Sequence, residues 1–165
     1  MQHPMSEYLL AGEPLQGRNA HEAGRQLLEK LYARRYGEPL PPIERTENGK
    51  PYFPGKSVYF SISHTQKNVF CVLSSRLVGL DAEEADRKVH GSLAKHILSP
   101  GEFAQYEHAP DPRLALLTFW VLKEAEAKRT GKGIRGYPND TDFDLTDPRV
   151  QMLNGCLVAV VEGEA

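Results

Sequence analysis

The sequence predicts an α+β protein of two similar lobes, each with a helix packed on a small antiparallel sheet. Two segments with helical spacing of apolar residues, 19–36 and 112–130, predict the main helices. An Asn-Gly turn inside 150–161, between two apolar runs, predicts a hairpin. Because helix and antiparallel strands occur twice, we place one lobe at 1–84 and the other at 85–165, in one compact pseudo-dimeric unit.

The first half is predicted to contain the first helix and most of the strands. Gly37 directly follows the helical pattern, and glycine in this position commonly ends a helix. Alternating or apolar runs separated by turn residues predict strands. The expected strands lie at residues 8–11, 43–46, 51–53, 58–63, 69–73 and 78–83.

The second half begins with helices. Apolar periodicity predicts a helix over 88–98. Ser99 and Glu102 form a capping-box pattern that predicts the start of a second, short helix. The longest helix follows and is expected to end at Gly131, and a short strand is expected at 143–145.

Composition limits the function classes. The chain has 165 residues and a net charge of −2, so no overall basic field favours nucleic acid or an anionic membrane. Cys71 and Cys156 lie in separate apolar runs and are expected to be buried thiols. No basic and apolar leader and no stretch of membrane-spanning length occurs in the sequence, so we expect a cytoplasmic protein.

Two carboxylates project from one face of a predicted strand. Asp81 and Glu83 are two residues apart, so their side chains point the same way. Mg²⁺ prefers hard oxygen ligands and commonly takes one or two carboxylates. The pair therefore indicates a metal site, although solvation at a strand end explains the same pattern.

The last helix carries a third carboxylate. Glu124 and Lys128 are one turn apart, and a surface ion pair worth about 0.3–0.5 kcal/mol is the simple interpretation. Trp120 precedes Glu124 on nearly the same side, so we expect Glu124 at the edge of the core, where a charge needs a partner. Lys123 and Glu126 point elsewhere and are assigned to the surface.

Three further polar residues suggest a phosphate site. Ser63 and His64 end a predicted strand, where their side chains can reach a cleft and bind phosphate oxygens. Lys50, after the turn at 48–49, offers a positive charge. A histidine with a local hydrogen bond is the alternative reading of His64.

Four motifs occur in a fixed order: NGKP at 48–51, FSISH at 60–64, GLDAE at 79–83 and FWVLKEAEAKRTGKG at 119–133. Together they resemble the 4'-phosphopantetheinyl transferase superfamily. The chain length on either side of GLDAE resembles the Sfp-like (surfactin-synthetase-activating) branch, in which two lobes are fused, rather than the short trimeric holo-acyl-carrier-protein synthases. The chain is short for that branch, so we expect an N-terminal lobe without its first strands.

The resemblance implies a Mg²⁺-dependent transfer of the phosphopantetheine arm of coenzyme A to a serine of an apo acyl or peptidyl carrier protein, with release of 3',5'-adenosine bisphosphate. It implies that Asp81, Glu83 and Glu124 hold Mg²⁺. Glu124 is also our candidate for the general base, while Lys128 and His64 offset charge on the leaving group.

The resemblance also implies contacts with coenzyme A. The expected contacts are Lys50 with the 3'-phosphate, Ser63, His64 and Lys128 with the diphosphate, and Arg25, or else Arg18, as the arginine of the family's first helix.

A local basic patch is expected to meet an acidic carrier protein, despite the negative total charge. Since both lobes are in one chain, we expect a monomer. The patch comprises Lys123, Lys128, Arg129, Lys132 and Arg135, with the loop at 131–136.

Two other functions fit the same residues. A non-catalytic protein that binds a carrier or coenzyme A would keep the fold without the reaction. A metal-dependent phosphohydrolase would use the acidic cluster with water as the acceptor. The fate of coenzyme A in the presence of an apo carrier separates these functions from transfer.

Overall fold

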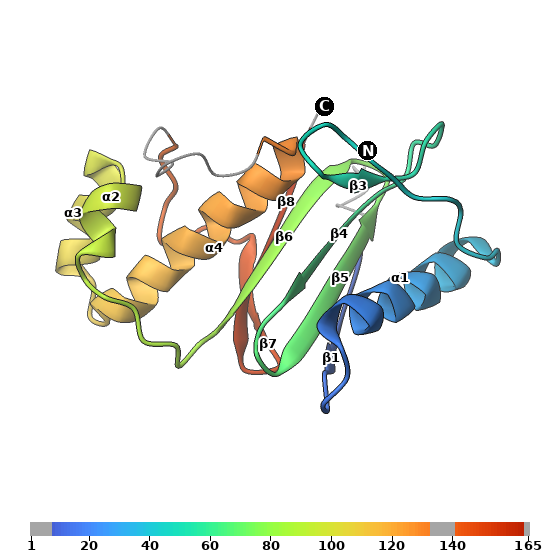
Figure 1. The fold of residues 1–165 in the computed structure, drawn as a ribbon. Coiled ribbons are helices and arrows are strands. Elements are labelled where there is room, and N and C mark those ends of the chain that lie inside the picture. Colours follow the sequence, from blue (N-terminus) through green and yellow to red (C-terminus); the bar gives the residue numbers. More distant parts are fainter. Residues whose placement is uncertain (1–7, 133–140, 164–165) are drawn as a thin grey trace, which may run out of the picture.

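The structure, a computed structural model, describes residues 8–132 and 141–163 and combines helices with small antiparallel sheets (Figure 1). The α+β class predicted from the sequence is therefore confirmed. The strands are β1 (Leu9–Pro14), β2 (Glu44–Arg45), β3 (Pro51–Tyr52), β4 (Tyr59–His64), β5 (Asn68–Ser74), β6 (Leu77–Glu84), β7 (Val150–Leu153) and β8 (Cys156–Gly163). The helices are α1 (Ala20–Tyr36), α2 (Leu93–Ile97), α3 (Pro100–His108) and α4 (Pro112–Thr130).

Helix α1 covers the first three-stranded sheet, which has the order β1-β5-β4. It begins where the Asn19 side chain accepts a hydrogen bond from the Glu22 amide, and it ends at Gly37, whose φ of 66° suits glycine. Leu27 and Leu31 are buried against the sheet. This helix and its two ends agree with the sequence prediction.

A second three-stranded sheet, with the order β6-β8-β7, carries α4 on one face. Figure 1 shows β4 and β6 side by side at the centre of the molecule. Leu80 and alternate residues of β5, β6 and β8 form a core shared by the two sheets. On β6, Asp81 has the opposite orientation and faces α4. The polar site thus lies on the helix-covered face of the second sheet.

Strand β6 belongs to the second sheet. It pairs with β8 along its whole length, from Leu77 opposite Gly163 to Glu84 opposite Cys156. The lobe boundary that we placed after residue 84 therefore does not coincide with the change of sheet, which falls between β5 and β6. Sequence order alone grouped β6 with the preceding strands because its partner follows α4.

Gly79 lets α4 lie very close to β6. A Cβ atom at this position would be 1.8 Å from the Ala125 carbonyl oxygen and 2.4 Å from the Arg129 amide nitrogen. Both obstacles are backbone atoms, so a side-chain movement cannot relieve the clash. Glycine at 79 thus sets the spacing that brings Asp81 within reach of α4.

Two predicted elements differ from the structure. The helix expected over 88–98 is reduced to α2, and the Arg113 guanidinium binds the carbonyls of Ala85 and Arg87 in the chain that precedes it. The strand expected at 143–145 does not form. Its amides bind side chains instead, with Phe143 donating to a Glu102 carboxylate oxygen at 2.7 Å.

The prediction that Lys123 lies on the surface is wrong. Its ammonium lies 2.8 Å from a Glu102 carboxylate oxygen, and both side chains have 0% exposure. It also donates to the Thr141 hydroxyl at 2.8 Å. The residue therefore joins α3, α4 and the chain after residue 140, and it is not part of an exposed basic patch. In 8–132 and 141–163, no helix has both the length and the hydrophobicity needed to cross a bilayer.

Candidate functional site

A pocket of about 380 Å³ lies between the two halves. One wall comes from the first half, with Lys50 after the β2–β3 turn and Phe60 and Ile62 on β4. The other wall is the C-terminal part of α4, with Glu124 and Lys128. A pocket that combines apolar side chains with a few charged groups is typical of a small-molecule site.

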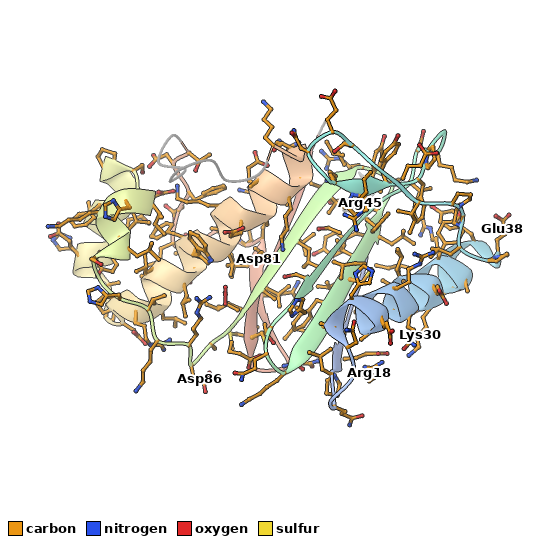
Figure 2. All side chains as sticks on the ribbon, viewed as in Figure 1. Arg18, Lys30, Glu38, Arg45, Asp81 and Asp86 are labelled. Carbon is orange, nitrogen blue, oxygen red and sulfur yellow. The ribbon has the colours of Figure 1, made fainter. Side chains whose placement is uncertain are left out.

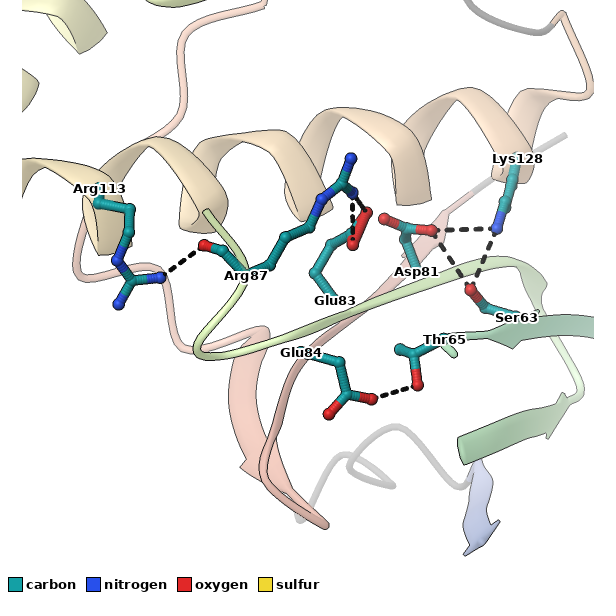
Figure 3. A network of polar contacts seen from close by, with 8 residues as sticks. All are labelled: Ser63, Thr65, Asp81, Glu83, Glu84, Arg87, Arg113 and Lys128. Carbon is teal, nitrogen blue, oxygen red and sulfur yellow. Dashed lines mark hydrogen bonds and ion pairs between the residues drawn. The ribbon is translucent and has the colours of Figure 1, made fainter. Parts of the chain in front are cut away.

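Asp81 is the centre of a polar network beside this pocket (Figure 3). Its Oδ1 accepts hydrogen bonds from Lys128 Nζ at 3.1 Å and from Ser63 Oγ at 3.3 Å. Lys128 Nζ also lies 3.3 Å from Ser63 Oγ. These three residues come from β6, α4 and β4, so the network joins the two halves of the chain. Figure 2 shows Asp81 beneath α4.

The second oxygen of the Asp81 carboxyl lacks a partner. Oδ2 is buried, and the described part of the chain offers it no hydrogen bond. Burial raises the pKa of Asp81 to about 6, although the nearby Lys128 charge opposes the rise. A buried carboxylate with one unsatisfied oxygen is uncommon in folded proteins and calls for a positive ligand or a proton.

Glu124 lies on α4 one turn before Lys128 and is partly buried. Burial, together with the negative charges of Asp81 and Glu83, raises the pKa of Glu124 to about 7, although the Lys128 charge opposes the rise. The three carboxylates predicted to act together therefore lie close enough for their charges to interact. For Asp81 and Glu124, these neighbouring negative charges add to the effect of burial and make ionisation harder.

Glu83 is already engaged. Arg87 donates to both of its carboxylate oxygens, at 2.6 and 2.7 Å. The Arg113 guanidinium in turn binds the Arg87 carbonyl at 2.8 Å, as Figure 3 shows. Sequence reasoning did not include Arg87, because a residue four positions after an acidic strand carries no sign of its partner.

Asp81 and Glu124 nevertheless fit a hard divalent cation. They supply oxygen ligands, one of them an unsatisfied buried atom, and burial is the main cause of their raised pKa values. Over 8–132 and 141–163, however, no group of three or more His, Cys, Asp or Glu residues is arranged to hold a metal.

A second pocket, of about 340 Å³, adjoins the first and shares Phe60 and Ile62 with it. Its basic lining comes from Arg25 on α1, Arg45 on β2 and His64 at the end of β4. The sequence singled out Arg25 and His64 but not Arg45, which occupies a two-residue strand without a pattern of its own. The lining suits an anionic group.

Arg18, the alternative to Arg25, serves a different purpose. Its guanidinium binds the carbonyls of Pro14 and Leu15 and lies 3.3 Å from a Glu13 carboxylate oxygen. It therefore closes the connection between β1 and α1. Figure 2 shows it well away from Asp81.

The other basic residues predicted to bind coenzyme A or the carrier protein have different surroundings. Lys50 donates to the Val78 carbonyl on β6 and to the Lys128 and Arg129 carbonyls at the end of α4. Arg129 is ion-paired with Glu126 on the same helix. Lys132 is exposed. Arg135 and most of the predicted loop at 131–136 lie outside the described residues.

Comparison with known proteins places this arrangement in a family. Residues 77–155 match the family model of the 4'-phosphopantetheinyl transferase superfamily. The match starts at the first residue of β6 and includes Asp81, Glu124 and Lys128. The chain belongs to this superfamily. Other members of the superfamily resemble it over a longer stretch.

A putative 4'-phosphopantetheinyl transferase of Haemophilus influenzae is 35% identical over 109 residues, which cover 63% of this chain and 46% of that protein. The 4'-phosphopantetheinyl transferase Sfp of Bacillus subtilis is 29% identical over 91 residues, which cover 53% of this chain and 40% of Sfp. The matched region thus spans less than half of each of these relatives. The Sfp-like branch expected from the motifs is confirmed.

Proposed function

We propose that the protein transfers the 4'-phosphopantetheine group of coenzyme A to a serine of an apo carrier protein and releases 3',5'-adenosine bisphosphate. The observation that carries this proposal is the partly buried Asp81–Lys128–Ser63 network with Glu124 at its side. The network brings carboxyl groups, a hydroxyl and an ammonium together beside a pocket whose lining suits a nucleotide. The names of the related proteins support the same reaction.

The two adjoining pockets suit the two ends of the nucleotide. The apolar wall of Phe60 and Ile62 offers a surface for a base, and the basic lining with Arg25 and His64 suits a phosphate. Lys128, which faces Asp81, would bind the diphosphate. A ligand with one flat ring and several phosphates, such as coenzyme A, matches this combination.

Asp81, Glu124 and, once released from Arg87, Glu83 would hold Mg²⁺. When bound, the cation supplies charge neutralisation at the diphosphate. The rest of the chemistry belongs to the side chains of this chain.

The reaction forms a bond between the serine oxygen of the carrier and the β-phosphorus of coenzyme A, and it breaks the bond from that phosphorus to the bridging oxygen. The serine proton passes to Glu124, the carboxylate that lies on the pocket wall. The Lys128 ammonium offsets the charge that builds on the departing bisphosphate. Ser63 and His64 orient phosphate oxygens.

The carrier protein is proposed to approach along the end of α4, where Lys132 is exposed. Carriers of this class are acidic around their modified serine, so positive charge at the mouth of the site would steer them. Because both halves of the pocket come from one chain, we propose a monomer that acts in the cytoplasm without nucleic acid or membrane.

The test is to incubate the purified protein with coenzyme A, Mg²⁺ and an apo carrier and to weigh the carrier by mass spectrometry. A gain of one phosphopantetheine group supports transfer. Binding of coenzyme A without that gain indicates a non-catalytic binding protein. Release of bisphosphate without a carrier indicates a phosphohydrolase, and either result overturns the proposal.

A further inference from the structure

Lys50 lies on the first-half wall of the pocket, yet its ammonium points to backbone atoms. It donates to the carbonyls of Val78 at 3.2 Å, Lys128 at 2.5 Å and Arg129 at 2.9 Å. An ammonium has three N–H donors, so these contacts use all of them. A phosphate bound by Lys50 would have to displace at least one.

The three acceptors explain why a cation sits there. The Lys128 and Arg129 carbonyls belong to the last turn of α4, where carbonyls have no partner within the helix and carry the negative end of the helix dipole. Val78 belongs to β6. One side chain from the first half thus ties together the helix and the strand that bear Lys128 and Asp81.

The contact is rigid on both sides. The Lys50 amide donates to the Thr46 hydroxyl at 3.1 Å, and the Thr46 amide donates to the Lys50 carbonyl at 2.9 Å. Arg45 binds the Gly49 carbonyl at 2.8 Å. On the other side, a Cβ at Gly131 would lie 3.0 Å from the Lys50 side chain, so the stem packs directly on the helix end.

We propose that Lys50 is a positioning residue that locks the C-terminal end of α4 across the interface of the two halves, and not a ligand of the coenzyme A 3'-phosphate. The expected effect of Lys50 on kcat/KM rests on the proposed transferase function. Because the clamped carbonyl is that of Lys128 itself, losing the clamp lets the Lys128 and Glu124 side chains drift from Asp81. Small misplacements of this kind are costly for catalysis.

The experiment compares coenzyme A with 3'-dephospho-coenzyme A as substrates for Lys50→Met, which keeps the aliphatic stem. We expect kcat/KM to fall by about tenfold to a hundredfold with both substrates and by the same factor. Lys50→Arg should recover part of the loss, since its guanidinium can still reach two carbonyls. Lys56→Met, on an exposed loop of the same half, should match the wild type.

A loss confined to coenzyme A would make Lys50 a phosphate ligand and overturn the proposal, as would an unchanged kcat/KM with both substrates. Hydrogen–deuterium exchange without substrate tests the clamp independently of catalysis. Lys50→Met should accelerate exchange in the last turn of α4 and leave α1 unchanged. Unaltered exchange there contradicts the clamp, even if the wild type proves inactive and the transferase function fails.

Discussion

Asp81 and Glu124 are carboxyl groups whose surroundings resist their ionisation. Burial is the largest cause for both, and it outweighs the attraction of Lys128, which lies 3.1 Å from Asp81. A group in this condition either takes a proton or binds a cation. Both outcomes are useful to an enzyme that must accept a serine proton beside a diphosphate.

Glu124→Gln should lower the transfer rate by about 10²–10⁴-fold, because glutamine keeps the shape but accepts no proton. The fold should persist, since Glu124 is only partly buried. The measurement is the initial rate of carrier modification, with circular dichroism to confirm folding. Glu107→Gln, at an exposed position of α3, is the matched control. Near-normal activity in folded Glu124→Gln would remove this residue from the mechanism.

Arg87→Gln should tighten the binding of Mg²⁺, or of Mn²⁺ as its substitute, by about twofold to fivefold. This factor corresponds to the free energy of a partly exposed ion pair. The reason is that Arg87 occupies both oxygens of Glu83 and must leave before a cation can use them. Calorimetric titration of the metal measures the effect.

Lys67→Gln is the control for this prediction, because it removes an exposed positive charge near Glu84 without touching Glu83. If both variants tighten binding equally, the effect is general electrostatics and competition by Arg87 is refuted.

At the scale of elements, neighbouring residues of α4 face two different surroundings, the pocket and helix α3. Glu124 and Lys128 face the pocket, whereas Lys123 is buried against Glu102 of α3. The sequence predicted a helix over 112–130 that ends at Gly131, and α4 has these bounds, with the Asp111 side chain capping its start. It could not predict the burial of Lys123, because the partner that satisfies its charge is on another helix.

Lys123→Met should destabilise the protein by about 3–5 kcal/mol, because it leaves the Glu102 charge buried without its cation. Adding Glu102→Gln should recover much of that loss, since the remaining group is neutral. Urea unfolding measures both variants. Arg25→Met, from an exposed pair with Glu29, is expected to stay within about 1 kcal/mol of the wild type. A loss as small for Lys123→Met would contradict the role of the buried pair.

At the scale of the whole molecule, the site exists because two sheets meet at β4 and β6. Sequence reasoning named Ser63, Asp81 and Lys128, and the fold brings all three together. It did not foresee that Lys50 would be bound to carbonyls. That outcome depends on how closely α4 approaches β6 at Gly79, which is a property of packing that no local pattern records.

The stability of the metal-free protein should fall as pH rises from about 4.5 to about 7. Asp81 and Glu124 have folded pKa values of about 6 and about 7, above the ordinary values of 3.8 and 4.5. Over this range the folded chain therefore binds more protons than the unfolded chain, and raising the pH favours unfolding. Carboxyls with a lowered pKa, such as Glu13 and Glu84, change the stability only at lower pH, where they become protonated.

Urea unfolding at about pH 5 and about pH 7.5 measures this slope. Glu124→Gln should flatten it, and Mg²⁺ should restore stability mainly at the higher pH, where both carboxyls are ionised. A slope that Glu124→Gln leaves unchanged would place the proton uptake elsewhere in the molecule.

The central claim is that a cation and a diphosphate share the space between Asp81, Glu124 and Lys128. A crystal structure with coenzyme A and Mn²⁺, in which anomalous scattering locates the metal, tests it most directly. We predict Mn²⁺ in contact with Asp81 and Glu124, and a phosphate oxygen within hydrogen-bond reach of Lys128 Nζ. Metal bound elsewhere, with the Asp81–Lys128 pair intact and the nucleotide outside the pocket, would contradict the account.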